Sequence, residues 1–432
     1  MSALPSQVNY NELLLRLPEN TTNFLASALP TNGSTFGPGS IAQVDLQTNR
    51  GFLDPASLSN RYKVVVTNSA NASPKLVGTP AYTFINKFVS YVNSQTIETI
   101  SNYNTVANLL TNIKLSTAQK LGQQYSLGYL SATPILAVDN EEIDGRTCSA
   151  TSDDFYLSAP LYSLLGNSEK LIPLFLLQNM RMEFTFESLA NISSNLVGDV
   201  KATGYTISNF EVVYNVIDFG AEIQRQIMSE NPQILIKTSS YNTSIAPIAL
   251  GTNGNINLIY NLRYASIKSA FLNFGGTSTD NVDGSANKNM DSFDITRSSG
   301  DYSLQISGIS YPQKALSALS NRAGIFNELR RAMGSLFNNN NSMAINTLEF
   351  GKEDGSGTEI TVPAKFWVGF NLQKLTIESK AFFSGVSTNN SPITAIINTN
   401  TATTQAYNAM LIAVYDAIIQ IDTQTKQCVI VS

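Results

Sequence analysis

Apolar and polar residues alternate along much of this chain, as they do in β-strands with one buried face. Two long stretches of this pattern resemble each other. Residues 172–188 lead into residues 205–219, and residues 362–379 lead into residues 406–420. In both places an apolar residue followed by Pro opens the first strand, Glu-Ser closes it, and Val-Tyr lies inside the second. The repetition predicts two copies of one β domain. Chance likeness is the alternative, because every half-buried strand needs this alternation.

Shorter runs of β-branched and aromatic residues indicate further strands. We expect them at residues 41–47, 62–67, 81–92 and 96–100 in the first half, and at residues 234–237, 256–262, 265–274 and 302–309 in the second. Residues 102–113 and 314–337 change to a period of 3.6, which predicts helices inserted among the strands. Residues 221–228 form a brief candidate helix that ends before Pro232, and a short amphipathic stretch at residues 10–17 lies in an N-terminal arm.

These elements predict an all-β protein with inserted short helices, divided into three parts. Residues 1–30 would form the N-terminal arm, which docks on a neighbour or under its own domain. Residues 31–225 would form a first β domain, and residues 226–432 a second that contains the inserted helix at about 314–337. A chain of 432 residues is too long for one ordinary core and suits two domains of this size.

Charged residues make up only 14% of the chain, while Asn, Ser and Thr are abundant. Such a surface is polar without strong repulsion between copies, so it tolerates dense self-association. The formal net charge is -5, and the first forty residues carry a single basic residue, Arg16. Because an arm that neutralised nucleic acid would need clustered Lys and Arg, we expect no direct binding of nucleic acid.

The chain contains no histidine, which removes the commonest general base, the Ser-His and Cys-His nucleophile pairs and a usual zinc ligand. Carboxylates gather at residues 139–144 and 153–154, where a glycosidase pair or a calcium site could form. They lack the alternating oxygen ligands of a calcium loop and are more typical of a solvated turn. Gly-rich pieces at residues 251–254 and 354–359 lack the Lys-Ser/Thr of a phosphate loop and fit hairpin turns. We therefore expect no enzyme, no cofactor, and no catalytic, cofactor-binding or metal-binding residues.

Two cysteines, Cys148 and Cys428, do not offer a disulfide framework, which suggests folding in a reducing compartment inside the cell. The N-terminus lacks a basic region followed by an apolar one, so we expect no signal peptide. The longest apolar runs, residues 171–177 and 410–414, are too short to span a bilayer.

Four further segments occur in a characteristic order. They are FLDPASL at residues 52–58 before a strand, a strand, turn and helix at 84–110, FWVGFNL at 366–372, and SGVST at 384–388. Together with the tandem β domains, this order resembles the double jelly-roll major capsid proteins of small eukaryotic double-stranded DNA viruses, the virophage and polinton-like group. The resemblance covers most of the chain and rests on pattern and element order. This chain is short for the family, which leaves little room for large outer loops.

The resemblance implies two tandem eight-stranded jelly rolls, each built of two facing antiparallel sheets. It also implies a major capsid protein whose trimers have a pseudo-hexagonal outline and tile an icosahedral virion shell. The implied partners are other copies of the chain, neighbouring capsomers, and penton and minor capsid proteins, without sequence-specific nucleic acid; an internal membrane is left open. The implied location is the virion, after folding and assembly inside the host cell. The alternative is a β-sandwich adhesin, fibre or lectin-like protein that binds glycans, although Trp367 lies inside an apolar strand and is more typical of a core.

Overall fold

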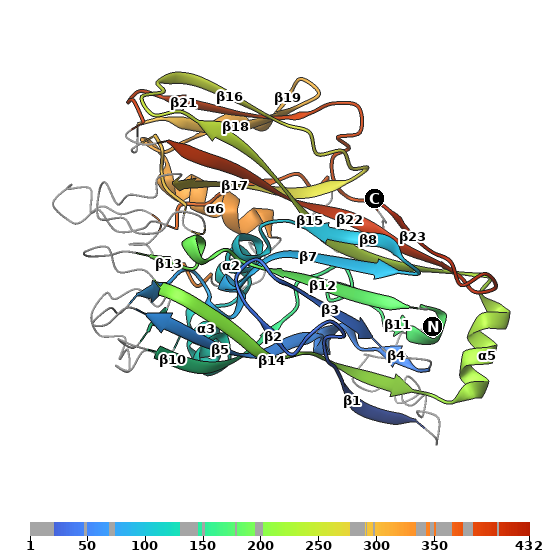
Figure 1. Cartoon of the computed structure of the whole chain (residues 1–432). Helices are drawn as coiled ribbons and strands as arrows, with labels where there is room; N and C mark the ends of the chain where they lie inside the picture. The colour runs from blue at the N-terminus through green and yellow to red at the C-terminus, as the bar shows by residue number, and fades with distance from the viewer. Residues whose placement is uncertain are drawn as a thin grey trace, which may run out of the picture.

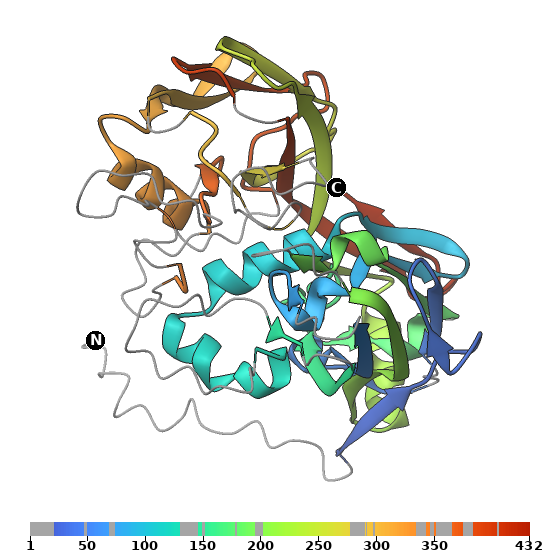
Figure 2. The same ribbon diagram turned by 60° about the vertical axis from the view of Figure 1, so that its left-hand side comes forward.

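Strands dominate the structure, and they form two stacks of sheets that lie one above the other in Figures 1 and 2. The computed structural model describes residues 21–46, 50–68, 74–129, 146–148, 152–177, 179–194, 202–276, 290, 292–296, 299–333, 343–345, 350, 365–374, 383–403 and 406–432. Among these residues, no helix is both long and apolar enough to cross a membrane.

The lower stack in Figure 1 contains two main antiparallel sheets and one small sheet. Its first sheet has the order β10 (Ser152–Pro160), β5 (Ser59–Asn68), β14 (Ala202–Asp218), β4 (Phe52–Leu53) and β11 (Ile172–Pro173), and β14 also pairs with β1 (Thr22–Ala28) and β2 (Thr35–Phe36). Its second sheet has the order β3 (Ile41–Leu46), β12 (Met180–Phe186), β7 (Ile85–Val92) and β8 (Gln95–Ile100). The small sheet joins β13 (Ser193–Ser194), β6 (Lys75–Leu76) and β9 (Arg146–Thr147). Because β1 belongs to the first sheet, the described part of the predicted arm packs on its own domain.

The upper stack also contains two antiparallel sheets. Its first sheet has the order β15 (Gln233–Ile248), β22 (Tyr407–Asp422), β17 (Ile267–Gly276) and β20 (Val368–Asn371), and β23 (Cys428–Val431) also pairs with β22. Its second sheet has the order β16 (Gly254–Tyr260), β21 (Ile393–Thr399), β18 (Asp301–Ile306) and β19 (Ile309–Ser317). Apolar side chains between the two sheets are buried, among them Trp367, which is 0% exposed.

The eight main strands of each stack pair in the same order. Counted along the chain within each stack, the first, eighth, third and sixth strands form one sheet, and the second, seventh, fourth and fifth form the other. The lower series is β1, β3, β5, β7, β8, β10, β12 and β14, and the upper series runs from β15 to β22. Two facing antiparallel sheets of this kind form a jelly roll, so the chain is a double jelly roll, as the sequence predicts. We call the lower stack roll 1 and the upper stack roll 2.

The helices lie in the connections between strands. They are α1 (Pro80–Thr83), α2 (Tyr103–Lys114), α3 (Thr117–Gly122), α4 (Gln124–Leu127), α5 (Ala221–Glu230) and α6 (Arg322–Ala332). In roll 1, α2 to α4 follow the fifth strand, and in roll 2, α6 follows the fifth strand. Helix α5 joins the last strand of roll 1 to the first strand of roll 2 at one end of the molecule, and none of its residues is buried (Figure 1). The predicted helices at residues 102–113 and 221–228 are therefore confirmed.

Two predictions of local structure are wrong in part. The helix expected at residues 314–337 begins later, because residues up to Ser317 belong to β19, and α6 starts after Asn321. The Asn321 side chain accepts a hydrogen bond from the Gly324 amide and so caps the helix. Residues 334–337 lie outside the described residues. The strand expected at residues 81–92 also begins later, because α1 starts at Pro80, a residue favoured in the first turn of a helix.

The repeat is present, but half of the alignment that indicated it is wrong. Strands β14 and β22 are both the eighth strand of their rolls, so residues 205–219 and 406–420 correspond. Residues 172–188 contain β12, a seventh strand, whereas residues 362–379 contain β20, a sixth strand. The two strands look alike because half-buried strands share one alternation of apolar and polar residues. The expected helix at residues 10–17 lies outside the described residues.

Candidate functional site

The acidic residues singled out in the sequence do not form a reaction centre in the part of the chain that the structure describes. The Arg146 guanidinium Nε lies 2.9 Å from Asp153 Oδ2, and the Lys63 ammonium lies 2.8 Å from Asp154 Oδ2. Residues 139–144 lie outside the described residues. Within the described ranges, no three His, Cys, Asp or Glu side chains lie close enough to hold a metal ion. Each of the two placed carboxylates thus belongs to a salt bridge of roll 1.

The Gly-rich segments and the tryptophan have structural roles. Residues 251–254 form a turn that leads into β16, but it is not the predicted hairpin turn, because β15 pairs with β22 and β16 pairs with β21 in another sheet. Gly251 and Gly254 have φ angles of 78° and 85°. These angles lie in the left-handed region that favours glycine. Residues 354–359 lie outside the described residues. Trp367 is completely buried next to β20, so it is a core residue rather than a platform for a sugar.

The two rolls meet along β15. This strand lies across one side of roll 1, next to the segments that follow β8 and β10. The Thr243 hydroxyl on β15 donates to the Ser101 carbonyl, directly after β8, at 3.1 Å. The Asn167 side chain, which follows β10, donates to the Ser239 carbonyl on β15 at 2.9 Å. Because β8 is an edge strand of the second sheet of roll 1, β15 covers this edge, and it also contacts the segment that follows β10. We call this contact the roll junction.

Glu98, on β8, lies at the centre of the roll junction and is 3% exposed. Its Oε1 accepts hydrogen bonds from the Ser240 hydroxyl on β15 and from the Leu164 amide, the latter at 2.8 Å. Its Oε2 has no hydrogen-bond partner among the described residues. Burial raises the pKa of Glu98 to about 7, although the two hydrogen bonds act in the opposite direction. The roll junction therefore contains a carboxyl group that changes charge near neutral pH.

Two aromatic side chains of roll 2, Tyr264 and Tyr415, lie near Glu98. The rings of Tyr264 and Tyr415 are stacked, with centroids 3.8 Å apart and an interplanar angle of 16°. The hydroxyl of Tyr241, on β15, accepts a hydrogen bond from the Lys114 ammonium at 3.2 Å. Rings of this size keep water away from the carboxyl group, which explains why its charged form is disfavoured.

The polar face of α2 is also buried at the contact between the rolls. The Ala344 amide donates to the Asn112 carbonyl at 2.9 Å, and the Asn108 side chain donates to the Met290 carbonyl at 3.4 Å. The sequence predicted a helix with one buried apolar face, yet all residues from Tyr103 to Ile113 are buried. The second face is buried because segments of both halves of the chain cover it: within roll 1, Asn108 also accepts a hydrogen bond from the Thr79 hydroxyl, and Asn104 donates to Glu187.

A polar cavity of about 170 Å³ lies between the rolls. Glu187, in its wall, accepts hydrogen bonds from three asparagine side chains: Asn86, Asn104 and Asn191. Roll 2 contributes Asn273, which is 1% exposed. Walls made of carboxamides suit water or another polar group, so this part of the contact is polar as well.

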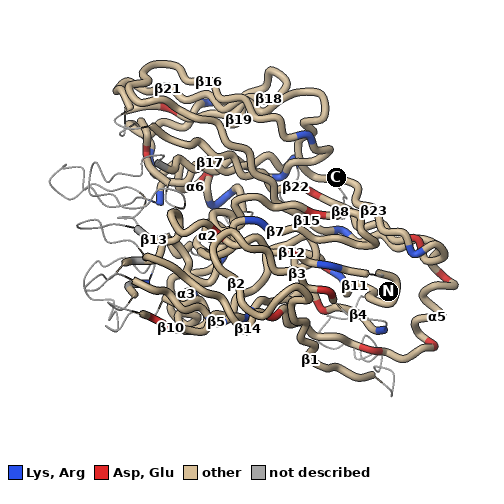
Figure 3. Tube along the Cα trace, in the orientation of Figure 1, with Lys and Arg blue, Asp and Glu red and all other residues tan. Residues whose placement is uncertain are grey.

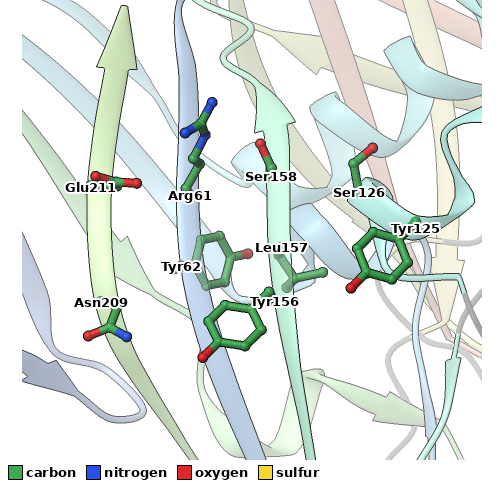
Figure 4. A pocket seen from close by; sticks show the side chains of 9 residues that line it. All are labelled: Arg61, Tyr62, Tyr125, Ser126, Tyr156, Leu157, Ser158, Asn209 and Glu211. Carbon is green, nitrogen blue, oxygen red and sulfur yellow. The ribbon is translucent and has the colours of Figure 1, made fainter. Parts of the chain in front are cut away.

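A pocket of about 380 Å³ lies on the outer face of the first sheet of roll 1 (Figure 4). Two tyrosines flank it, Tyr156 on β10 and Tyr125 on α4, and they are 61% and 77% exposed. Arg61 and Glu211 are paired neighbours on β5 and β14 at its other side, and the Ser27 hydroxyl of β1 donates to the Glu211 carboxylate. The lining is mostly apolar and open to solvent, so the pocket can receive an apolar side chain or the face of a sugar ring.

Charged residues are widely spaced along the described trace of both rolls (Figure 3). The full chain has 27 basic and 32 acidic residues among its 432 residues. Contacts between copies of this chain would therefore involve mostly uncharged side chains, whose interactions salt screens only weakly.

The comparison with known proteins supports this architecture. No protein-family model matches the sequence, and no curated protein is similar to it in sequence. The chain is similar to the solved structure of the Faustovirus major capsid protein, with a TM-score of 0.62, 9% identity, and coverage of 96% of this chain and 94% of that chain. It is also similar to PBCV-1 VP54 fitted into a reconstruction of the virophage Sputnik (TM-score 0.60, 11% identity, coverage 97% and 98%) and to the mavirus major capsid protein (0.55, 12%, 100% and 95%). The whole chain thus has the double jelly-roll fold of viral major capsid proteins.

The central residues of the roll junction were not among the candidates from the sequence. Glu98 stands in the strand between Ile97 and Ile100, and an acidic residue in such a run usually faces water. Ser240 lies in a polar stretch of β15, and a stretch of this kind is typical of an exposed edge strand. Only the placement of β15 against β8 shows that these two side chains meet.

Proposed function

We propose that this chain is a major capsid protein that assembles as trimers into the shell of an icosahedral virion. A trimer would bring six jelly rolls into a ring with a pseudo-hexagonal outline, and neighbouring trimers would tile the shell. The role is structural, and its partners are other copies of the chain and of its capsomers, together with penton and minor capsid proteins rather than nucleic acid. The chain would fold and assemble inside the host cell and reside in the virion.

One observation carries this proposal: two rolls with the same strand order are joined in one chain through a built contact. Within the chain, roll 2 packs against β8, the fifth strand of roll 1. Roll 2 has its own fifth strand, β19, so roll 1 of another copy can pack against roll 2 in the same way. A head-to-tail contact of this kind closes into a ring when the rotation between copies divides a full turn. The chain is similar in fold to viral major capsid proteins over nearly its whole length, which supports the same proposal.

We also propose the division into two rolls: the arm at residues 1–30 contributes β1 to roll 1, which continues through residues 31–225, and roll 2 comprises residues 226–432. Helix α5 supports the second boundary, because it lies between the two strand series and has no buried residue. The pairing of β1 with β14 ties residues 22–28 of the arm to roll 1. Limited proteolysis that cuts within α5 and leaves two protected fragments would support this division.

The native mass of the purified chain tests the trimer. Light scattering at two concentrations should give about 140 kDa, three times the 46.8 kDa of one chain. Images of the main peak by electron microscopy should show a pseudo-hexagonal outline. A monomer at every concentration would contradict the proposal.

A second function, glycan binding, is favoured by the pocket that Tyr125 and Tyr156 flank, because exposed aromatic rings beside polar groups stack on sugars. A glycan array probed with the purified protein tests it, with the variants Tyr125→Ala and Tyr156→Ala as controls. Binding that both substitutions abolish would support this function. A protein that forms trimers and binds no glycan would contradict the glycan-binding function and support only the capsid role.

A further inference from the structure

The side of roll 2 that is equivalent to the roll junction is uncovered in the described structure. Strands β8 and β19 are both the fifth strand of their rolls and lie at the edge of the second sheet. In roll 1 this edge is covered by β15. In roll 2, β19 has no buried residue, and Ile309 at its start is 55% exposed.

The residue equivalent to Glu98 can be identified from the register of the strands. In each roll the fourth and fifth strands are joined by two residues with positive φ, at positions 93–94 and 307–308. Counted from this turn, the third pair is Ser90 with Glu98 in roll 1, and Leu304 with Tyr311 in roll 2. Tyr311 thus has the place of Glu98, yet it is only half-buried, because nothing in the described chain lies across it as β15 lies across β8.

The residue equivalent to Ser240 follows from the first sheets. Ser240 is paired with Tyr415. Residues 205–219 of β14 correspond to residues 406–420 of β22, so Tyr214 corresponds to Tyr415, each in the Val-Tyr pair that both strands contain. The residue of β1 that is paired with Tyr214 is Ala26. Ala26 thus has the place of Ser240; it is half-buried, and its neighbour Leu25 is 59% exposed.

We propose that β1 of one copy lies across β19 of the next copy, as β15 lies across β8 within the chain, and that Ala26 of one copy contacts Tyr311 of the other. This inference rests on the proposed trimer and names the strands through which its copies meet. The partner of this surface is therefore a second copy of the same chain. The contact replaces the polar pair of Ser240 and Glu98 by an apolar pair.

Burial and charge on both strands fit this contact. Strand β1 carries no charged residue, its Phe24 and Leu25 are 40% and 59% exposed, and it pairs only with β14. An uncharged apolar edge strand promotes association with other chains unless it is covered. The pocket flanked by Tyr125 and Tyr156 borders the same region, because Glu211 lines it and is bonded to Ser27 of β1. A neighbouring copy that covers β1 would therefore also approach this pocket.

Cysteine cross-linking tests the contact. The double variant Ala26→Cys with Tyr311→Cys should form disulfides between copies under a mild oxidant, with covalent trimers on a non-reducing gel. Each single variant should stay monomeric on that gel. The native thiols do not interfere, because burial raises the pKa of Cys148 to about 12 and that of Cys428 to about 11. The matched control is Ala26→Cys with Leu250→Cys, since Leu250 is 65% exposed and lies between β15 and β16, and β16 is at the edge of the second sheet opposite to β19.

A second variant covers the case in which Tyr311→Cys impairs folding. Leu25→Lys changes only an exposed side chain beside Ala26, so the chain should fold. The trimer fraction should fall about tenfold at a fixed concentration, because the added charge loses water when the copies meet; Leu250→Lys should leave it unchanged. Trimers by light scattering that neither cross-link through positions 26 and 311 nor respond to Leu25→Lys would overturn this inference and leave the trimer standing. A native monomer would overturn both, and disulfides in the Leu250 control equal to those of the test pair would overturn the named contact.

Discussion

The Ser240 hydroxyl of roll 2 donates a hydrogen bond to the buried Glu98 carboxylate of roll 1. The same carboxylate oxygen accepts a bond from the Leu164 amide, and the other oxygen has no partner among the described residues. A buried charge with only one of its two oxygens satisfied is costly, so the protonated form of Glu98 is favoured in the folded protein.

Substitution of Glu98 should therefore change how stability depends on pH. Its pKa rises from 4.5 to about 7 in the fold, so the folded protein keeps a proton that the unfolded chain has lost between these values. The free energy of unfolding should fall by about 3 kcal/mol as the pH rises through this window and should be level above it. Glu98→Gln, which is neutral at every pH, should lose this component. Denaturant titrations of both proteins near pH 5 and near pH 8 measure it, and an equal difference between them at both pH values would contradict it.

Asp416 should contribute strongly to the stability of roll 2. The residue is 0% exposed, and its Oδ2 accepts hydrogen bonds from the Ser266 hydroxyl at 2.7 Å and the Ser384 amide at 3.0 Å. Its Oδ1 lies 3.2 Å from the Lys268 ammonium. Asp416→Ala should lower the free energy of unfolding by about 3 kcal/mol, because it leaves buried donors and a partly buried cation without a partner.

The control for Asp416 is the exposed ion pair between Arg181 and Asp45, whose side chains are 45% and 36% exposed. Arg181→Ala should cost less than about 1 kcal/mol. Chemical unfolding of the two variants compares the pairs directly. Similar losses for both would show that burial does not decide the difference.

Gly369 should be required for the packing of α6 on β20. A Cβ atom at this position would lie 2.7 Å from the Leu329 Cα and 3.2 Å from the Ala332 Cβ, both on α6. Gly369→Ala should therefore lower the unfolding free energy by about 1–3 kcal/mol, because the helix must move away from the sheet. Gly122→Ala is the matched control: at the end of α3 the added methyl group meets open space, so the change should be neutral or slightly stabilising. Thermal unfolding of the two variants should show a lower midpoint only for Gly369→Ala.

Salt should affect the proposed trimer little. The strands assigned to the contact between copies, β1 and β19, carry only one charged residue, Lys314. The trimer fraction measured by light scattering should hence change less than about twofold between about 0.05 M and about 0.5 M NaCl. A trimer that dissociates in high salt would point to a contact made by charged residues elsewhere.

The fold could be predicted where a segment satisfies one simple periodic pattern. Strands β14 and β22 and helix α2 follow from alternation and from a period of 3.6, and the repeat of the two halves follows from the first pair. Residues 314–337 show the limit of this reasoning. Apolar residues in β19 and in α6 are spaced by chance as in one helix, and only the pairing of Leu316 with Tyr302 shows that the first part is a strand.

The roll junction could not be predicted from the sequence, because it depends on contacts between distant positions. Glu98 and Ser240 are 142 residues apart, and each looks like a solvent-facing residue in its own strand. The equivalence of Tyr311 and Ala26 to this pair appears only when the registers of four ladders are known. No composition or spacing rule contains that information.

Helix α5 explains why the contact within the chain can be polar while the proposed contact between copies is apolar. A tether of ten helical residues, about 15 Å long, holds the two rolls together, so their association costs little translational entropy. The tether gives each roll a local concentration of its partner in the millimolar range, and hydrogen bonds suffice to fix the geometry. Separate chains have no such tether and meet at the concentration the cell provides. Their contact must supply the free energy of association itself, which is a reason for the chain to expose Leu25 on β1 and Ile309 on β19.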